Sequence, residues 1–438
     1  MKIINKVMIF MAIGILSTSC DVEEFSDLNG PEVDALVEDL SRGDLQDLVG
    51  GVFYSMRVGL GTYYDDVGVI GREFYRFSSS DPRFTADLLG KQNAVLDNNT
   101  FYITTPWAAR YRSVKNTNII LEGLNNTTAD FSTEELSATR GFLNTIKAYE
   151  LLLNLNLTDE NGIRLDVNNP DNLGPIVSKA EALSVIQSLL TGAATDLASG
   201  GSEFPFVMTS GFSEFNTPQG FLEINKAFSA RVAAYQGNFP AVLSFLEDSF
   251  LDLNGDLDTG VYYVFSENQN DLINPVFFQQ NASAAGARIV QPKFISEAEA
   301  GDNRVDEKIS LREETITFDG LSGDYDFFLY TTRTQEIPVI RNAELILLYA
   351  EANITANPTE AVEAFNVIRN AASLPDYSGP QTQAALTAEM LKQRRYELYG
   401  EGHRWIDARR YNILNTLPID RAGDDVFSKF PIPLTENE

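Results

Sequence analysis

Cysteine and histidine are almost absent from this sequence of 438 residues, which contains one of each. A single cysteine excludes a disulfide framework and a thiolate metal cluster. A single histidine excludes a metal site built from several imidazoles and leaves one histidine to serve as a base. The sequence also lacks a phosphate-binding Gly-Lys-Ser/Thr loop, a zinc helix with paired histidines and a serine nucleophile elbow. We therefore predict no metal and no cofactor.

Positive charge is scarce as well. Acidic residues outnumber lysine and arginine by 62 to 33, which gives a formal net charge of −29. This balance argues against a nucleic-acid partner, because nothing would neutralise the phosphates. Hydrophobic residues make up 44% of the chain and charged residues 22%, and both values are typical of a globular protein.

Long hydrophobic runs are missing, and the one clear apolar run lies at the N-terminus. Residues 7–16 follow Lys2 and Lys6 and precede small polar residues and Cys20. This layout is typical of a secretory signal peptide, and the run is too short to span a bilayer. A short buried helix is the alternative. We predict a signal peptide over 1–19 and, because the pattern is similar to a lipoprotein signal, acylation (palmitate) at Cys20.

The remaining sequence carries dense helix signals. Ser132 with Glu135, and Ser178 with Glu181, have the spacing of a capping box. The predicted helices cover 106–124, 132–157, 179–198, 221–236, 240–251, 338–355, 358–372 and two stretches of 382–411 that separate near 400–402. Several form pairs of about 34 residues, the size of a tetratricopeptide-like unit. We expect an all-α fold with its scaffold mainly in 106–251 and 338–412.

Two long regions interrupt the helical pattern, 59–104 and 252–336, and both are rich in aromatic residues. Connections this long are usually functional in compact domains. We expect both regions to be irregular and to lie together on one side of the scaffold.

The C-terminal part combines isolated acids with clustered arginines. Glu344 and Glu351 are two turns apart in an otherwise apolar helix, so both should be buried on one face. A buried carboxylate needs a partner, and the arginines of 394–412 are the obvious ones. We predict a structural charge network, although an anion-binding patch is the alternative. Its members are Glu344, Glu351, Arg395, Arg404 and Arg410.

These C-terminal segments resemble the SusD/RagB family of outer-membrane nutrient-binding lipoproteins from Bacteroidetes. The residues that carry the resemblance are Arg341-Asn342-Ala343-Glu344, Tyr349-Ala350-Glu351-Ala352, Arg394-Arg395, Glu397, Glu401-Gly402-His403-Arg404-Trp405, Asp407, Arg409-Arg410 and Phe430-Pro431-Ile432-Pro433. The resemblance implies one SusD-like domain over 20–438, built on tetratricopeptide-like helix pairs with long loops as the ligand face. It also implies a lipid-anchored protein on the outer membrane that captures glycans for a SusC-like TonB-dependent transporter and is not an enzyme.

A glycan site needs flat aromatic faces for stacking and polar side chains that orient the hydroxyls. The segment 63–84 contains both types, and Trp107 follows at a helix start. The alternative is that the segment forms a turn and packs into the core. The predicted glycan-binding residues are Tyr63, Tyr64, Arg72, Tyr75, Asp81, Arg83 and Trp107. Tyr325 and Tyr330 are weaker candidates.

Three further hypotheses stay open. A helical-barrel glycoside hydrolase needs only two carboxylates, so the sequence does not exclude one. A scaffold protein without a ligand would use the helical repeats for protein contacts. The oxygen donors Asp252, Asn254 and Asp256 suggest a calcium loop, but Leu257 stands where that loop requires glycine, which favours a plain acidic turn.

Overall fold

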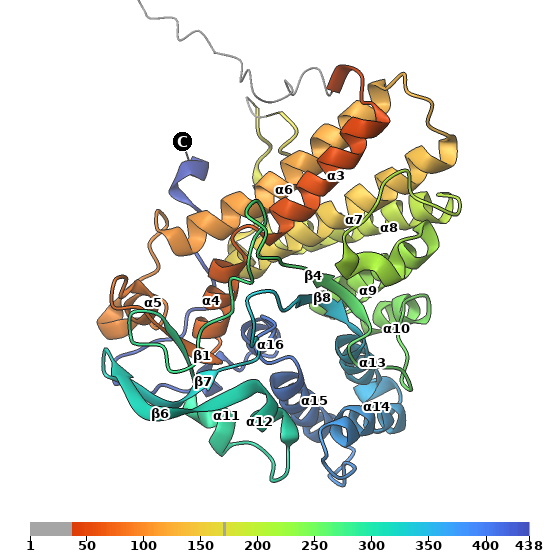
Figure 1. The fold of residues 1–438 in the computed structure, drawn as a ribbon. Helices are drawn as coiled ribbons and strands as arrows, with labels where there is room; N and C mark the ends of the chain where they lie inside the picture. The colour runs from red at the N-terminus through yellow and green to blue at the C-terminus, as the bar shows by residue number, and fades with distance from the viewer. Residues whose placement is uncertain (1–36, 170–171, 438) are drawn as a thin grey trace, which may run out of the picture.

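A computed structural model describes residues 37–169 and 172–437 (Figure 1). The predicted signal peptide and Cys20 lie outside the described residues. No helix in the described part of the chain is both long and apolar enough to cross a membrane.

Helices make up most of the described chain. They are α3 (Arg42–Arg57), α4 (Leu60–Ile70), α5 (Arg83–Ala86), α6 (Phe101–Asn126), α7 (Thr133–Thr158), α8 (Lys179–Ala198), α9 (Pro218–Tyr235), α10 (Phe239–Glu247), α11 (Pro292–Ser296), α12 (Asn303–Lys308), α13 (Asn342–Ala356), α14 (Pro358–Ala371), α15 (Gln383–Glu397) and α16 (Arg404–Arg410). Short 3₁₀ turns include η4 (Leu414–Thr416) and η5 (Leu434–Asn437).

The long helices stack in chain order. Contacts run from α3 to α6, and then through α7, α8, α9 and α10 to α13 and α14. Figure 1 shows these helices as one curved array along one side of the molecule. Each helix packs on the next helix of this series, as in a tetratricopeptide-like solenoid. This arrangement confirms the predicted helix-pair scaffold.

Local signals explain where these helices begin. The Ser132 side chain accepts from the Glu135 amide and the Glu135 carboxylate accepts from the Ser132 amide, so the predicted capping box starts α7. The Ser178 hydroxyl likewise accepts from the Glu181 amide at the start of α8. Proline occupies the first turn of α9, α10 and α14, where its missing amide hydrogen costs nothing.

The two long regions predicted to be irregular contain a sheet instead. Its strands are β1 (Phe74–Phe77), β5 (Ala287–Val290), β7 (Leu321–Phe327) and β6 (Ile309–Phe318), paired antiparallel in that order. β6 and β7 form a hairpin whose turn, Asp319-Gly320, has positive φ at both residues, as a type I′ turn requires. Because β1 belongs to one long region and β5 to the other, their pairing confirms that the two regions lie together (Figure 1).

Three other boundaries differ from the prediction. α6 begins at Phe101 and contains Pro106 in its second turn, so the helix starts before the proline that was expected to begin it. Residues 337–341 form β8 (Ile337–Arg341), which pairs with β4 (Gly260–Tyr263), and only then does α13 begin. Two short strands, β2 (Ile163–Arg164) and β3 (Ile176–Val177), were also not expected.

A close contact fixes α4 against the sheet. A Cβ atom at Gly68 would lie 2.5 Å from the ring of Phe74, so only glycine allows this approach. Phe74 is buried and packs on Phe327 of β7, with ring centroids 4.8 Å apart. The sheet therefore joins the helical array through one aromatic core.

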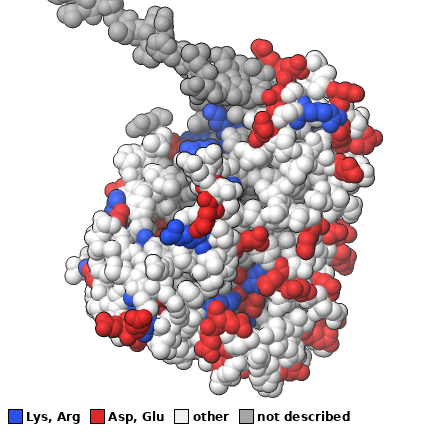
Figure 2. Space-filling view, viewed as in Figure 1, with Lys and Arg blue, Asp and Glu red and all other residues white. Residues whose placement is uncertain are grey.

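Charge is distributed unevenly over the surface. On the face shown in Figure 2, acidic side chains gather along the side formed by the helical array, and lysines and arginines are fewer and scattered. Any positive site must therefore be local, as the net charge of −29 suggests.

Candidate functional site

The predicted stacking rings lie in the core. Tyr63, Tyr64, Tyr75 and Trp107 are each at most 5% exposed. The Tyr63 hydroxyl accepts from Asn156 at 3.2 Å, and the Trp107 indole donates to Glu436 at 2.9 Å. The expectation that these rings present open faces to a sugar is contradicted by this burial.

Arg72 is a core residue too. It is 2% exposed and has a positive φ of 55°. Its guanidinium donates to main-chain carbonyl oxygens, at 3.1 Å to Pro418 and 2.6 Å to Asp425. Burial lowers its pKa to about 10. Arg72 therefore joins the C-terminal segment to the turn after α4, which is a structural role.

Asp81 and Arg83, in contrast, lie at the surface as predicted. The Arg83 guanidinium donates to both carboxylate oxygens of Asp81, at 2.8 Å and 2.7 Å. This pairing lowers the pKa of Asp81 and raises the pKa of Arg83. The Arg83 side chain is 47% exposed, so its outer face is free to contact a ligand.

Arg83 belongs to a row of neighbouring arginine and phenylalanine side chains. The sequence did not predict this row. All its members are at least partly exposed, and they come from β1, the segment around α5, the start of α6 and the β4–β5 connection. We call it the arginine–phenylalanine surface: Arg76, Asp81, Arg83, Phe84, Phe101 and Phe278. Figure 1 shows β1 and α5 together at one side of the molecule, away from α13 and α14.

The ring contacts in this row are direct. The Arg83 guanidinium carbon lies 4.8 Å from the centroid of the Phe101 ring, which packs on Phe84 with centroids 4.9 Å apart. The Arg76 guanidinium carbon then lies 5.0 Å from Phe84 and 4.5 Å from Phe278. Cation–π contacts of this kind hold planar groups in fixed orientations at a surface.

A buried carboxylate supports the row from below. Asp65 accepts from Arg288 at 2.6 Å and 3.0 Å and forms an ion pair with Arg76 at 3.4 Å. Arg288 also lies under Phe278, 4.4 Å from the ring centroid. Burial lowers the pKa of Arg76. The inner end of the surface is thus preorganised, because each side chain is held by a partner.

The weaker candidates lie elsewhere. Tyr330 is 3% exposed and lines a cavity of about 510 Å³, beside Arg341, Glu397 and Glu401. Those charges are already paired, at 2.9 Å from Arg341 to Glu397 and 2.7 Å to Glu401. Tyr325 is partly exposed on β7. Neither tyrosine joins the arginine–phenylalanine surface.

The acidic turn uses its oxygen atoms internally. The Asp252 carboxylate accepts from the Asn254 amide at 2.8 Å, and the Asp256 carboxylate accepts from the Asp258 amide at 2.9 Å. Their carbonyls accept from the Asn342 side chain. Among the described residues, no group of three or more His, Cys, Asp or Glu side chains is arranged to hold a metal ion.

The predicted charge network is partly confirmed. Glu351 is buried and pairs with Arg410 as expected, and Tyr411 also donates to it at 2.6 Å. Glu344 is buried, but its arginine partner is Arg231 of α9, at 2.5 Å, so the prediction that it pairs with the arginines of 394–412 is wrong. From that segment, His403 lies 3.6 Å from the Glu344 carboxylate.

The other two arginines of that network are not joined to Glu344 or Glu351. Arg395 pairs with Glu297, and Arg404 donates to the carbonyl of Gly71 at 2.9 Å. The sequence showed which acids were buried, but the partner of Glu344 depends on helix stacking.

Comparisons with known proteins agree with this fold. The sequence profile described as "SusD family" matches residues 329–430. A SusD-like protein, P38, from Formosa agariphila is 39% identical over 85 residues, and this match covers 17% of this chain and 17% of that protein.

Solved structures are similar over nearly the whole chain. A SusD superfamily protein from Bacteroides vulgatus has a TM-score of 0.67 at 17% identity, covering 90% of this chain and 96% of that one. Surface glycan-binding protein A from Bacteroides thetaiotaomicron has a TM-score of 0.68 at 12% identity, with the same coverage of both chains. These likenesses establish the fold, and the profile match covers the segments with the motifs described above. Residues 329–430 of this chain thus match the SusD family profile, and the described chain has the fold of the SusD superfamily structures.

Proposed function

We propose that this protein binds glycans at the arginine–phenylalanine surface and does not cleave them. The observation that carries the proposal is the row of partly exposed phenylalanines flanked by Arg83 and Asp81. Aromatic faces stack on the C–H surfaces of sugar rings, and charged groups orient the hydroxyls. Relatives of the same fold are named as glycan-binding proteins, which supports this choice of ligand.

We propose that the protein is located on the outer face of a bacterial outer membrane. A signal peptide over 1–19 and a lipid at Cys20 would anchor the chain there, and the match of residues 329–430 to the SusD family profile supports a cell-surface protein. We further propose that the glycan passes to a SusC-like TonB-dependent transporter. Cys20 precedes the start of α3 by about twenty residues in the sequence.

The two glutamates whose pKa rises to about 7 are enclosed, and neither is placed as the acid of a hydrolase. A hydrolase needs a carboxylic acid with a raised pKa beside a second carboxylate in an open cleft. Burial raises the pKa of Glu73 to about 7, but Glu73 accepts from the Gly400 amide inside the core. Burial also raises the pKa of Glu150 to about 7, and Glu150 is fully enclosed with Arg110. Neither group faces the arginine–phenylalanine surface.

A glycan panel tests this proposal. The wild type is screened by affinity electrophoresis, and each glycan is then checked for cleavage products. The best ligand is titrated against Arg83→Gln and against Arg42→Gln as the matched control. Arg42 is 48% exposed, pairs with a carboxylate and covers a phenylalanine, like Arg83, but it lies on α3.

We expect retention without cleavage. Arg83→Gln should weaken binding at least about tenfold, since a charged hydrogen-bond donor is lost, and Arg42→Gln should bind like the wild type. Cleavage of the glycan would establish the hydrolase alternative. If Arg83→Gln and Arg42→Gln bind the glycan equally well, the glycan site lies elsewhere on the protein.

A further inference from the structure

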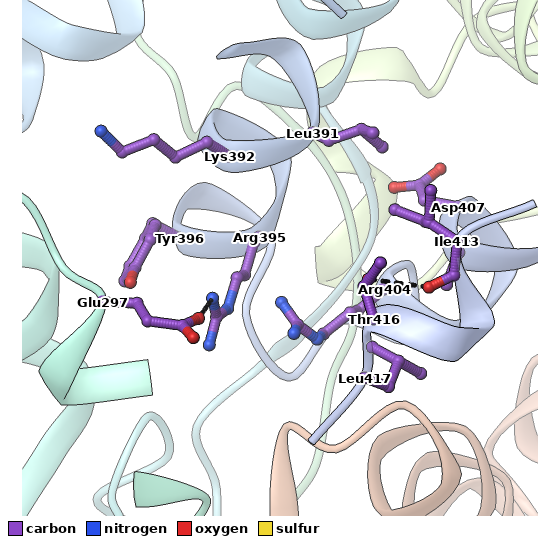
Figure 3. A pocket seen from close by; sticks show the side chains of 11 residues that line it. Glu297, Leu391, Lys392, Arg395, Tyr396, Arg404, Asp407, Ile413, Thr416 and Leu417 are labelled. Carbon is purple, nitrogen blue, oxygen red and sulfur yellow. Dashed lines mark hydrogen bonds and ion pairs between the residues drawn. The ribbon is translucent and has the colours of Figure 1, made fainter. Parts of the chain in front are cut away.

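A second positively charged site lies between the C-terminal helices. A cavity of about 410 Å³ is bounded by α15, α16, the η4 turn and Glu297 after α11 (Figure 3). Arg395 and Arg404 enter it from different elements, and Figure 3 shows their guanidinium groups pointing toward one another. This is a concentration of positive charge in a chain of net charge −29.

The acids of the cavity do not neutralise both arginines. Asp407 accepts from Arg394 at 2.6 Å and from Arg410 at 3.1 Å, so its charge is already balanced outside the cavity. Glu297 accepts from Arg395 at 2.5 Å. Arg404 has no carboxylate at ion-pair distance among the described residues, although Glu73 and Glu297 attract it from farther away.

Arg404 and Arg409 are the arginines of α16 without an ion-pair partner among the described residues, and of these two Arg404 lines the cavity. Its Nε atom donates to the Gly71 carbonyl at 2.9 Å, and no ion pair reaches it among residues 37–169 and 172–437. Its two terminal nitrogens make no hydrogen bond there, yet they are not enclosed, so they open into the cavity. Burial, followed by the charge of Arg395, lowers its pKa to about 10. An anion between the two guanidinium groups would remove this repulsion.

Arg395 offers a further unused donor. One terminal nitrogen binds Glu297, but the other is buried and has no hydrogen-bond partner. An unsatisfied buried donor costs free energy unless a ligand or water satisfies it. The two arginines together thus provide several free N–H groups around one space. The opposite wall is apolar and includes Leu391, Ile413 and Leu417.

We propose that this cavity binds a small ligand with a carboxylate, held between Arg395 and Arg404 with its carbon body against the apolar wall. Guanidinium groups match the planar carboxylate with paired hydrogen bonds, and such charge-assisted bonds are the strong ones in proteins. The cavity has the volume for one sugar-sized molecule or a small organic acid. The site does not depend on the arginine–phenylalanine surface or on glycan binding there.

The carboxylate has two sources, an acidic sugar such as a uronic acid or a free organic acid. Titration calorimetry with sodium glucuronate, sodium acetate and glucose, at constant ionic strength set with sodium chloride, separates them. We expect saturable binding of glucuronate and none of glucose. Acetate that binds as tightly as glucuronate assigns the site to free acids, and weaker acetate assigns it to acidic sugars.

Arg404→Gln should weaken glucuronate binding at least tenfold, and Arg42→Gln, on α3, should leave it unchanged. The proposal fails if glucuronate does not saturate, if Arg404→Gln binds like the wild type, or if chloride competes equally. In the last case the cavity holds an adventitious ion only.

A measurement on the unmodified protein covers the case in which Arg404→Gln does not fold. Phenylglyoxal labels accessible arginines, and mass spectrometry of peptides reports each one. Glucuronate should protect Arg404 from labelling and leave Arg42 reactive. Equal labelling of Arg404 with and without glucuronate would overturn the proposal.

Discussion

The ion pair between Arg231 and Glu344 should be a major determinant of stability. The guanidinium donates to both carboxylate oxygens, at 2.7 Å and 2.5 Å, and the side chains are 6% and 2% exposed. Arg231 also donates to the Val339 carbonyl at 3.0 Å, which joins α9 to β8. The pair thus connects the middle of the helical array with its C-terminal part.

Glu344→Ala removes one partner and leaves a buried guanidinium without its counter-charge. The cost of breaking a buried pair in this way is about 3–5 kcal/mol, because the remaining charge is desolvated. The double variant Arg231→Met with Glu344→Leu removes both charges and retains most of the volume. It should therefore recover most of the loss, because no unpaired charge is left buried.

Urea unfolding of the wild type and each variant measures these effects as shifts of the midpoint at constant m value. Asp248→Ala is the control, since it breaks an exposed pair with Lys226 and should cost less than about 1 kcal/mol. The reasoning is refuted if Glu344→Ala and the control have the same midpoint. Burial of the guanidinium would then carry no penalty.

Three other predictions address protonation, packing and anchoring. Burial lowers the pKa of His403 to about 4 from 6.5 in the unfolded chain. The unfolded state therefore binds more protons between these values, and stability should fall by up to about 3 kcal/mol as pH drops from 6.5 to 4. His403→Gln should flatten that part of a stability–pH curve measured by urea unfolding. Gly68→Ala should lower stability by about 1–3 kcal/mol in a thermal melt, because its Cβ would meet the Phe74 ring. Cys20→Ala should release the protein from cell membranes, and retention at the wild-type level in fractionation would contradict lipidation.

Local signals in the sequence were sufficient to predict much of the helical scaffold. A capping box acts within one turn, so Ser132 and Glu135 specify the start of α7 without help from the rest of the chain. The break between α15 and α16 was predictable for the same reason, since Gly400 and Gly402 both adopt positive φ there.

The sheet could not be predicted from local sequence patterns, because its strands pair over long distances in the chain. β1 pairs with β5 from a distant part of the chain, and Tyr75 lies opposite Ile289. Both strands are short and almost fully buried, so they lack the alternation of polar and apolar residues that marks a half-exposed strand. Residue type alone did not distinguish them from irregular loops.

The proposed site includes part of the predicted segment 63–84, but the rings predicted to line it are buried. Tyr75, for example, packs in the core, where its hydroxyl donates to Asp420. Phe84 and Phe101 are partly exposed, and arginine guanidinium groups lie over their rings. A signal was present in the sequence, since Arg83 stands beside Phe84, but pairing with Phe101 required the fold.

The most direct test of the central claim is a calorimetric titration of the best glycan from the panel against Phe101→Ala and Phe131→Ala. Phe131 is the matched control, because it is also partly exposed beneath an arginine, with Arg42 at 4.6 Å, but lies outside the arginine–phenylalanine surface. Phe101→Ala should lose about 1–3 kcal/mol of binding free energy, the value of a stacking anchor, and Phe131→Ala should bind like the wild type. Unchanged binding by a folded Phe101→Ala variant would contradict a glycan site at this surface.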